Sequence, residues 1–158
     1  RGILLDGASG TISDNHVLGI NQGASGCQEG NAIEARNAPF DTTGPDTTVS
    51  ITGNVVDDYQ KTGILVNGSV KATVTGNDVS GLGPVPYIAQ NGVQVSRGAT
   101  ATVESNRIAD NWYTGSADAI SCGLLLFEAD GVKQKRNVFV ANQQDLCNFG
   151  RGGGSTAG

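Results

Sequence analysis

"GILVNGSVKATVTGNDV", residues 63–79, decides the fold because its outline recurs along the chain. A glycine and an aliphatic pair come first, a turn containing glycine follows, and a second strand-like segment ends at an asparagine. Residues 2–17, 92–108 and 123–139 repeat this outline. A looser copy begins at Ala32, takes an insertion from about Pro39 to Thr47, and resumes at Thr48. The chain is therefore built from repeats.

The repeats have the length of solenoid coils. They start at residues 2, 32, 63, 92 and 123, so the steps are 29 to 31 residues. A repeat of this size cannot bury its apolar face alone and must stack on its neighbours. Apolar residues alternate, as in Ile64 and Val66, which is the pattern of strands with one buried face. With 24 glycines and 5% aromatic residues, the composition favours short strands and tight turns.

An asparagine recurs at the end of the second strand of each repeat. In most copies it stands 13 or 14 residues after the leading glycine, so the asparagines should occupy one corner of successive coils. Coils stack about 4.8 Å apart, which lets each side-chain amide bond to the next. The sequence therefore predicts an internal asparagine ladder of Asn15, Asn54, Asn77, Asn106 and Asn137. The last coil departs from the pattern, because Gln134 stands where an aliphatic residue is expected, and we expect looser packing there.

This combination resembles the right-handed parallel β-helix repeats of the pectate-lyase-like superfamily. The resemblance implies an all-β fold, a single-stranded right-handed parallel β-helix (solenoid) of about five coils, over residues 1–148. Residues 149–158 would form a flexible Gly-rich tail. Another β-solenoid or a β-sandwich is the alternative fold. The superfamily includes polysaccharide lyases, glycoside hydrolases, epimerases, phage tailspikes and non-catalytic adhesins, so the fold alone does not assign a function.

Charge and hydropathy argue against two classes of partner, nucleic acids and membranes. A formal charge of -5 argues against nucleic-acid binding, which needs clustered Lys and Arg. No apolar run approaches the length of a membrane span, so no membrane partner is expected. The chain begins inside a repeat at Arg1, which predicts an upstream segment or a partner chain that caps the first coil. A secreted, extracellular protein fits these features.

The aromatic residues indicate a sugar-binding surface. The three tyrosines and the single tryptophan fall between the regular parts of successive coils, where loops should form a wall. Aromatic rings with a polar edge stack on sugars, although they can also fold back and cover the outer face of the helix. We predict that a polysaccharide is bound by Tyr59, Tyr87, Trp112 and Tyr113 together with Gln94 on the adjoining strand.

Catalysis is left open by the sequence. In lyases that resemble this fold, the sheet beside the loops carries carboxylates that hold calcium and a Lys or Arg that acts as base. The corresponding candidates here are Glu34, Arg36, Asp57, Asp58 and Lys61. A hydrolase would instead need two carboxylates a fixed distance apart. The alternative is that these residues are ordinary solvated charges.

The chain has few residues that could bind a transition metal or form disulfides. His16 is the only histidine, so no transition-metal site and no cofactor is expected, and calcium shared by Asp110 and Asp118 is the one ion that the pattern allows. Cys122 and Cys147 are about one coil apart, which predicts a disulfide between neighbouring coils and an oxidising compartment. Three buried thiols are the alternative, and Cys27 is left unpaired in either case.

These observations predict an extracellular polysaccharide-binding β-helix, which could form part of a larger lyase or hydrolase. A non-catalytic structural or adhesive solenoid and a tailspike-like depolymerase fragment are the alternatives.

Overall fold

A computed structural model describes residues 1–37 and 45–150. Within these residues the regular secondary structure is all β-strand, and the strands follow one another in groups of three, one for each sheet. The first sheet contains β1 (Ile3–Asp6), β4 (Asn31–Asn37), β7 (Thr62–Gly68), β10 (Asn91–Ser96), β13 (Cys122–Phe127) and β16 (Gln144–Phe149). The second contains β2 (Gly10–Ser13), β5 (Thr47–Thr52), β8 (Val70–Thr75), β11 (Thr100–Glu104) and β14 (Lys133–Lys135). The third contains β3 (His16–Ile20), β6 (Val55–Tyr59), β9 (Asp78–Val85), β12 (Arg107–Tyr113) and β15 (Val138–Val140).

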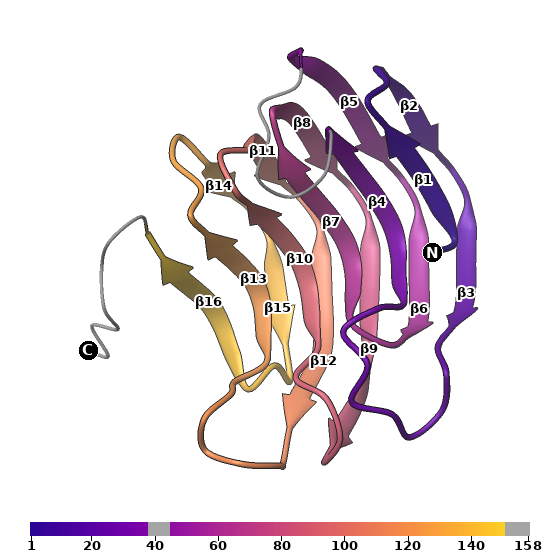
Figure 1. The fold of residues 1–158 in the computed structure, drawn as a ribbon, viewed down its shortest axis with the longest axis vertical. Helices are drawn as coiled ribbons and strands as arrows, with labels where there is room; N and C mark the ends of the chain where they lie inside the picture. The colour runs from indigo at the N-terminus through magenta and orange to yellow at the C-terminus, as the bar shows by residue number, and fades with distance from the viewer. Residues whose placement is uncertain (38–44, 151–158) are drawn as a thin grey trace.

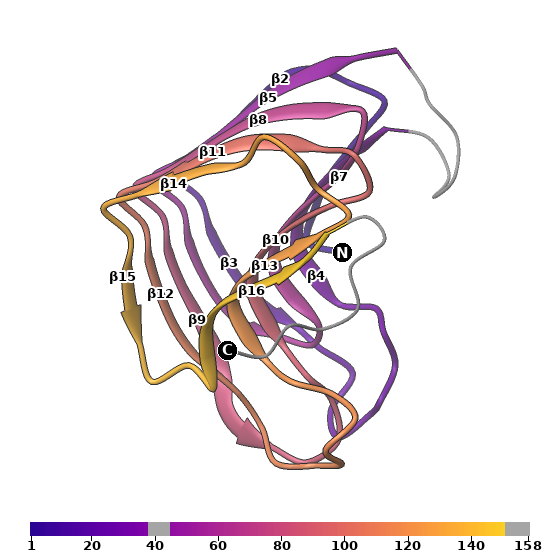
Figure 2. The same ribbon diagram turned by 90° about the vertical axis from the view of Figure 1, so that its left-hand side faces the viewer.

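The three sheets are the walls of one coil that climbs along the chain. Each strand pairs in parallel with the strand three places later, so β1 and β16 lie at opposite ends of the stack (Figure 1). A view turned by 90° shows the three walls, with the second and third sheets meeting at a narrow corner (Figure 2). This is a parallel β-helix of five complete coils, as predicted, and β16 adds one further strand.

The register confirms the repeat that was read from the sequence. Ile3 pairs with Ile33, which pairs with Ile64, and the row continues through Val93 to Leu124. From Ile33 onward these side chains are fully buried and form part of the core. Because side chains on a strand alternate between its faces, this register also fixes which residues of each strand point outward.

One backbone conformation makes the corner between the second and third sheets. The residue before each ladder asparagine has a positive φ, between 53° and 67°. These residues are Asp14, Gly53, Gly76, Ser105 and Arg136. The left-handed conformation turns the chain sharply between two strands, and non-glycine residues rarely adopt it. Its recurrence in all five coils keeps the following asparagines in line.

The asparagine ladder is confirmed. Each side-chain Nδ2 donates to the Oδ1 of the next asparagine at 2.9 to 3.0 Å, in the order Asn15, Asn54, Asn77, Asn106, Asn137. The same Nδ2 atoms bond backbone carbonyls, as Asn77 does to Ile51 at 3.0 Å. Asn54, Asn77 and Asn106 are at most 2% exposed, so these bonds satisfy polar groups that water cannot reach.

A second, shorter ladder lies near the end of the third sheet and was not predicted. Asn111 Nδ2 donates to Asn142 Oδ1 at 2.9 Å, and Asn142 Nδ2 donates to the backbone oxygen of Ile108 at 2.9 Å. Tyr59 continues this row, because its hydroxyl donates to Asn111 Oδ1 at 2.6 Å. Polar stacking therefore stabilises two corners of the coil.

The structure joins Cys122 to Cys147 in a disulfide, with their Cα atoms 5.9 Å apart. The spacing suggested that the two cysteines occupy equivalent positions of neighbouring coils, but they are not register partners. Cys122 pairs with Gln144, whereas Cys147 pairs with Leu125, so the bridge runs diagonally across the outer face of the first sheet. Cys27 is half-buried and not part of a disulfide.

The last coil is less regular than those before it. Gln134 is exposed and Phe139 is only partly buried, as the departure from the pattern predicted. β16 extends to Phe149, one residue beyond the predicted domain boundary. The predicted tail at 151–158 and residues 39–44 of the insertion lie outside the described residues. In the described part of the chain, no helix has the length and apolar character of a membrane span.

Candidate functional site

The outer face of the first sheet is a grid of three rows that run along the stack. The register aligns the outward positions of successive strands. The first row is Asn31, Thr62, Asn91, Cys122 and Gln144, the second is Leu4, Glu34, Leu65, Gln94, Leu125 and Cys147, and the third is Asp6, Arg36, Asn67, Ser96, Phe127 and Phe149. Charged residues occupy the early coils, neutral amides and hydroxyls the middle, and apolar residues the last.

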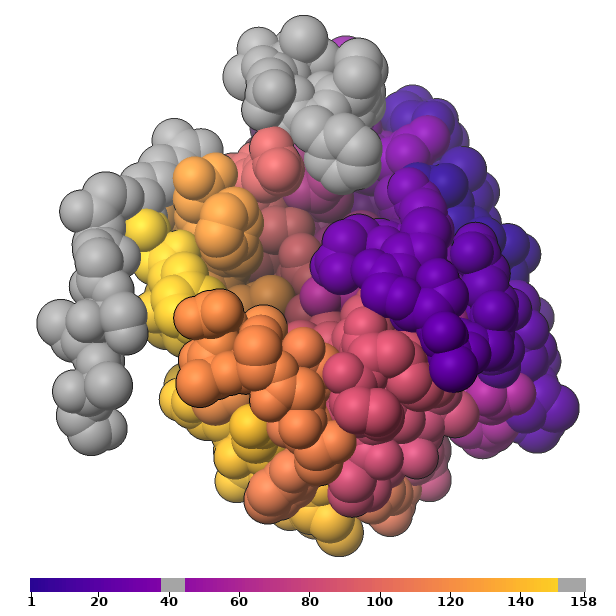
Figure 3. Space-filling view, turned by 60° about the horizontal axis from the view of Figure 1, so that its bottom comes forward, coloured from indigo at the N-terminus to yellow at the C-terminus, as the bar shows by residue number. Residues whose placement is uncertain are grey.

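A groove of about 410 Å³ lies over the middle of this grid. Its floor comes from β7, β10 and β13, and its walls include Arg1, Gln28, Glu29 and Arg97. In the space-filling view the molecule is hollowed between the violet segment that precedes β4 and the orange segments of the fifth coil (Figure 3). The groove crosses several strands, so it is elongated along the stack.

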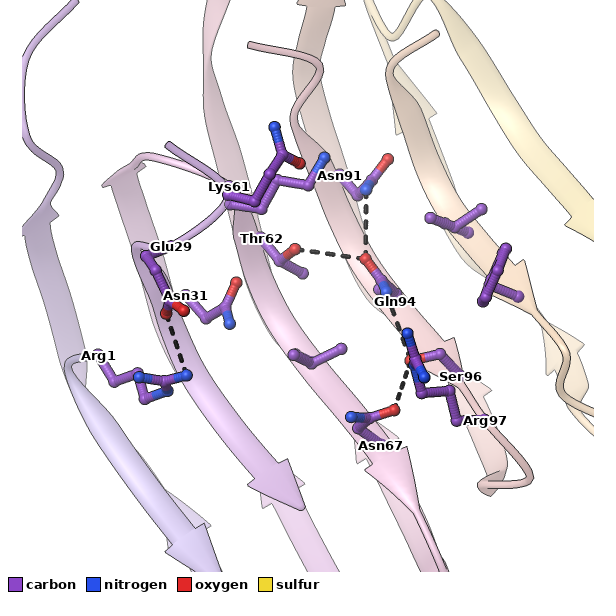
Figure 4. A pocket seen from close by; sticks show the side chains of 14 residues that line it. Arg1, Glu29, Asn31, Lys61, Thr62, Asn67, Asn91, Gln94, Ser96 and Arg97 are labelled. Carbon is purple, nitrogen blue, oxygen red and sulfur yellow. Dashed lines mark hydrogen bonds and ion pairs between the residues drawn. The ribbon is translucent and has the colours of Figure 1, made fainter. Parts of the chain in front are cut away.

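Hydrogen bonds link the polar residues on the floor of the groove (Figure 4). Gln94 Oε1 accepts from Asn91 Nδ2 at 3.3 Å and from the Thr62 hydroxyl at 3.5 Å. Gln94 Nε2 donates to Ser96 Oγ at 3.4 Å, and Ser96 Oγ donates to Asn67 Oδ1 at 3.0 Å. We call these five residues the groove row. Three of the four bonds are long, near the limit of a useful hydrogen bond.

Charges at the first end of the grid are paired with one another. Glu34 is fully buried, and its carboxylate accepts from Arg1 Nε at 2.6 Å and from Asn31 Nδ2 at 2.9 Å. Arg36 lies 3.4 Å from Glu34 and 2.8 Å from Asp6. The Asp6 hydrogen bond raises the pKa of Arg36, and Arg36 lowers the pKa of Asp6. Because these pairs occupy Glu34 and Arg36, neither is placed as an acid, a base or a calcium ligand.

Lys61 lies at the edge of the groove, between β6 and β7. Its Nζ donates to the backbone oxygen of Ala89 at 2.7 Å, and burial lowers the pKa of the amine because the charged form loses its hydration. Of the five catalytic candidates, Lys61 is the one whose side chain lines the groove.

The two aspartates lie on a different wall and do not join the other candidates. Asp57 is on β6 of the third sheet, where its Oδ2 lies 2.7 Å from His16 Nε2. Asp58 follows it with a φ of 52°, and its Oδ1 accepts from Asn21 Nδ2 at 2.6 Å. The structure therefore does not bring the five catalytic candidates together, because β6 and β4 belong to different sheets.

The predicted aromatic wall is also corrected. Tyr59 is fully buried, its hydroxyl bonded to Asn111, and burial raises the pKa of its phenol. It points inward because the positive φ of Asp58 shifts the alternation of β6. Tyr87 and Tyr113 are half-buried and Trp112 is 39% exposed on β12, where it pairs with Pro84 of the third sheet. The groove is lined instead by Phe127, and Gln94, which was predicted to bind the polysaccharide from the adjoining strand, is also among its lining residues.

Most of the groove row was not identified from the sequence, although a signal was present. Asn31, Thr62, Asn91 and Cys122 each stand directly before the residue that begins a coil, so an aligned repeat would have shown them as one column. Alternation from Leu65 and Gln94 also turns Asn67 and Ser96 outward, beside them. The glycosylation pattern "NGS" at residues 67–69 begins at Asn67, which is nearly buried.

The predicted calcium site gains no further ligands from the fold. Asp110 is half-buried at a positive φ of 59°, and Asp118 is exposed in the segment after β12. Within residues 1–37 and 45–150, no three His, Cys, Asp or Glu side chains gather where they could hold a metal ion together.

Comparison with known proteins supports the architecture. A family model described as the right-handed β-helix region matches residues 1–156. Neither the curated proteins nor the solved structures yield a match to this chain. The family match covers nearly the whole sequence and agrees with three stacked parallel sheets and an internal asparagine ladder. The chain therefore belongs to the right-handed β-helix family.

Proposed function

We propose that this β-helix binds an extended polysaccharide along the groove on its first sheet. The observation that carries the proposal is the groove row, a continuous set of amides and hydroxyls from β7 and β10 on the floor of an elongated groove. Sugar hydroxyls both donate and accept hydrogen bonds, and amide side chains offer both kinds of partner. A polymer laid along the stack would meet such groups on successive coils.

The hydrogen bonds within the groove row favour exchange with a ligand. Gln94 makes contacts of 3.3 to 3.5 Å, longer than the common N–H···O distance of about 2.9 Å. Replacing a long bond by a shorter one to a sugar hydroxyl costs the protein little. The Gln94 side chain is half-buried, so a ligand reaches it without unfolding the strand.

Apolar residues complete the groove. Leu65, Leu125 and Phe127 lie among its lining residues, and Phe127 is 37% exposed. The C–H faces of sugar rings pack on such surfaces, and an aromatic ring adds a large contact area. The disulfide beside this end is consistent with an extracellular protein, because such bonds persist in oxidising compartments.

The residues that line the groove support a binding function better than a catalytic one. Glu29 is the one carboxylate among the described residues that line the groove, and a hydrolase of the usual kind requires two. Lys61 has the lowered pKa that suits a base, but its amine is engaged by the Ala89 carbonyl.

Affinity electrophoresis tests the proposal. The protein is run in native gels that contain polygalacturonate, its methyl ester, carboxymethyl cellulose or hydroxyethyl cellulose, and released reducing ends are measured in parallel. We expect retardation by at least one polymer, and about a tenfold weaker affinity after Gln94→Ala, the loss of about one good hydrogen bond. Gln134→Ala makes the same change on the exposed face of β14 and should bind as the parent does.

The outcomes separate the candidate functions. Equal retardation of Gln94→Ala and the parent would show that the polysaccharide does not bind in the groove. A folded protein that none of the four polymers retards would favour the structural or adhesive solenoid. Release of reducing ends that stops when Lys61→Gln is introduced would establish an enzyme.

A further inference from the structure

We propose that the end of the groove between β4 and β7 binds an uncharged sugar unit, whose hydroxyl donates a hydrogen bond to the amide oxygen of Asn31. The inference rests on the proposed polysaccharide binding and adds the class of sugar and the residue that selects it. Two independent observations carry it: an unpartnered acceptor in the wall of the groove, and charges beside it that are already paired.

Asn31 offers half of its amide to the groove. The side chain is 5% exposed, and its Nδ2 donates to Glu34 Oε2 at 2.9 Å. Its Oδ1 is buried and accepts no hydrogen bond from the described residues. A buried carbonyl oxygen without a donor destabilises the folded chain, and a ligand hydroxyl that reaches it would relieve that cost. The Nδ2 bond to Glu34 also fixes the orientation of the amide, so the oxygen is the atom left for a ligand.

Asn31 lies beside Thr62, its register partner on β7, and both residues line the groove. Figure 4 shows Asn31 between Arg1 and Thr62, which belongs to the groove row. Thr62 in turn bonds Gln94, the centre of that row. A sugar bound at Asn31 would therefore be followed along the stack by units over Gln94 and Ser96, so this subsite is the first of a continuous series.

The charges around Asn31 do not favour an acidic sugar. Arg1 lies 3.0 Å from Glu29 and 2.6 Å from Glu34, so two carboxylates already face it. Lys61 bonds the Ala89 carbonyl, and its burial disfavours the charged amine. A uronate carboxylate would enter beside Glu29 and Glu34, where the Arg1 cation is already paired with both. Arg97, another cation of the groove, follows Ser96 at the opposite end of β10 from Asn91.

Matched polymers test the class of sugar. Polygalacturonate and its methyl ester share a backbone and differ in charge, as do carboxymethyl and hydroxyethyl cellulose. We expect the neutral member of a pair to bind at least as tightly as the charged one. Its affinity should change less than about twofold when salt is raised from about 0.05 to about 0.5 M, because screening acts on charges.

A substitution tests the residue. Asn31→Ser keeps a hydroxyl that can donate to Glu34 and withdraws the amide oxygen, and we expect about tenfold weaker binding of the neutral polymer. The charged polymer should lose less, so the ratio of the two affinities should shift. Gln134→Ala serves as the control, and circular dichroism establishes that each variant is folded. If Asn31→Ser does not fold, the comparison of matched polymers with the parent protein decides the class of sugar.

Each result has one meaning. Tighter binding of the charged polymer, weakened by salt, would overturn this inference and leave polysaccharide binding in place. The same holds if a folded Asn31→Ser variant shows unchanged affinities. Absence of binding to all four polymers would overturn the proposed function and this inference together.

Discussion

The asparagine ladder and the groove row use the same kinds of side chain in opposite ways. In the ladder, Asn77 Nδ2 donates to Asn106 Oδ1 at 2.9 Å and to the Ile51 carbonyl at 3.0 Å, and the residue is 2% exposed. In the groove row, Gln94 makes bonds of 3.3 to 3.5 Å and is half-buried. The ladder bonds all run between successive coils, whereas the groove row also contains bonds within β10.

On the proposed function, saturation of the hydrogen bonds, rather than residue type, separates a structural amide from a binding amide. A ladder amide has short bonds and no access to solvent, so it can only hold its neighbours. A groove amide has weak bonds that a ligand can replace. Asn31 is intermediate, because one side of its amide is bonded and the other is not. The following changes test this distinction, from the largest expected effect on stability to the smallest.

Asn77→Ala should be the most destabilising. It removes the acceptor for both the backbone N–H and the Nδ2 of Asn54, which lie at 2.9 Å and are fully buried. Two buried donors left without an acceptor should lower the free energy of unfolding by about 3 kcal/mol or more, measured by urea denaturation. Asn15→Ala is the matched control, because the half-buried Asn15 side chain donates to Asn54 Oδ1 and the Ser13 carbonyl but is not an acceptor in the ladder, and it should cost clearly less. Equal losses for the two variants would contradict the view that saturation in the middle of the ladder matters.

Removing the disulfide should have the next largest effect. The double change of Cys122→Ser and Cys147→Ser opens a link across 25 residues, and we expect a loss of about 3 kcal/mol from the greater entropy of the unfolded chain. The groove row lies on earlier coils, so polysaccharide affinity should change little at temperatures where the variant is folded. A tenfold loss of affinity would show that the last coil shapes the groove.

Tyr59→Phe removes one hydroxyl from the second ladder. The phenol donates to Asn111 Oδ1 at 2.6 Å in a fully buried site, so the change leaves an acceptor without its donor. We expect a loss of about 1 to 2 kcal/mol in urea denaturation and no change in polysaccharide binding. Reduced binding would instead support the original assignment of Tyr59 to the sugar-binding surface.

Lys61 gives a prediction for pH. Its pKa in the folded chain lies below the ordinary 10.5, so the unfolded chain binds more protons between the two values. Stability attributable to Lys61 should therefore rise with pH across that window. Relative to Lys61→Met, the parent should become more stable as pH is raised toward about 10.5, as followed by urea denaturation at several pH values. A difference that stays constant with pH would contradict the shift.

Gln94→Ala should affect stability least. Its three bonds are long and its side chain is partly solvated, so we expect less than about 1 kcal/mol in urea denaturation. The same variant is expected to lose polysaccharide affinity. A large loss of stability would place Gln94 with the structural amides and erase the contrast with Asn77.

Much of the fold could be predicted because it depends on a period in one dimension. The coil starts, the ladder and the outward positions of the first sheet all follow from aligned repeats, and the register bears them out. The second ladder escaped because only two coils carry it: Asn111 and Asn142 both stand five residues after a ladder asparagine, but the coil of Asn54 has Tyr59 at that position.

The site was harder to predict because it depends on contacts between sheets and between distant segments. Glu34 was a catalytic candidate, but the fold brings Arg1 from the preceding coil against it, and Arg36 of the same strand also pairs with it. Tyr59 was expected to be exposed, but the positive φ of Asp58 shifts the alternation of the strand and turns the ring inward. A backbone angle of this kind cannot be read from the sequence. The groove itself needs the segment before β4 as a wall, which no repeat contains.

The recurrent left-handed residue before each ladder asparagine has a consequence for how this chain can be altered. Because every coil makes that corner in the same way, a coil such as residues 63–91 is an interchangeable module with matching register at both faces. Duplicating it would lengthen the molecule, and the groove with it, by about 4.8 Å. On the proposed function, the length of polymer that the groove holds would change in fixed steps with each coil that gene duplication, or an engineer, adds.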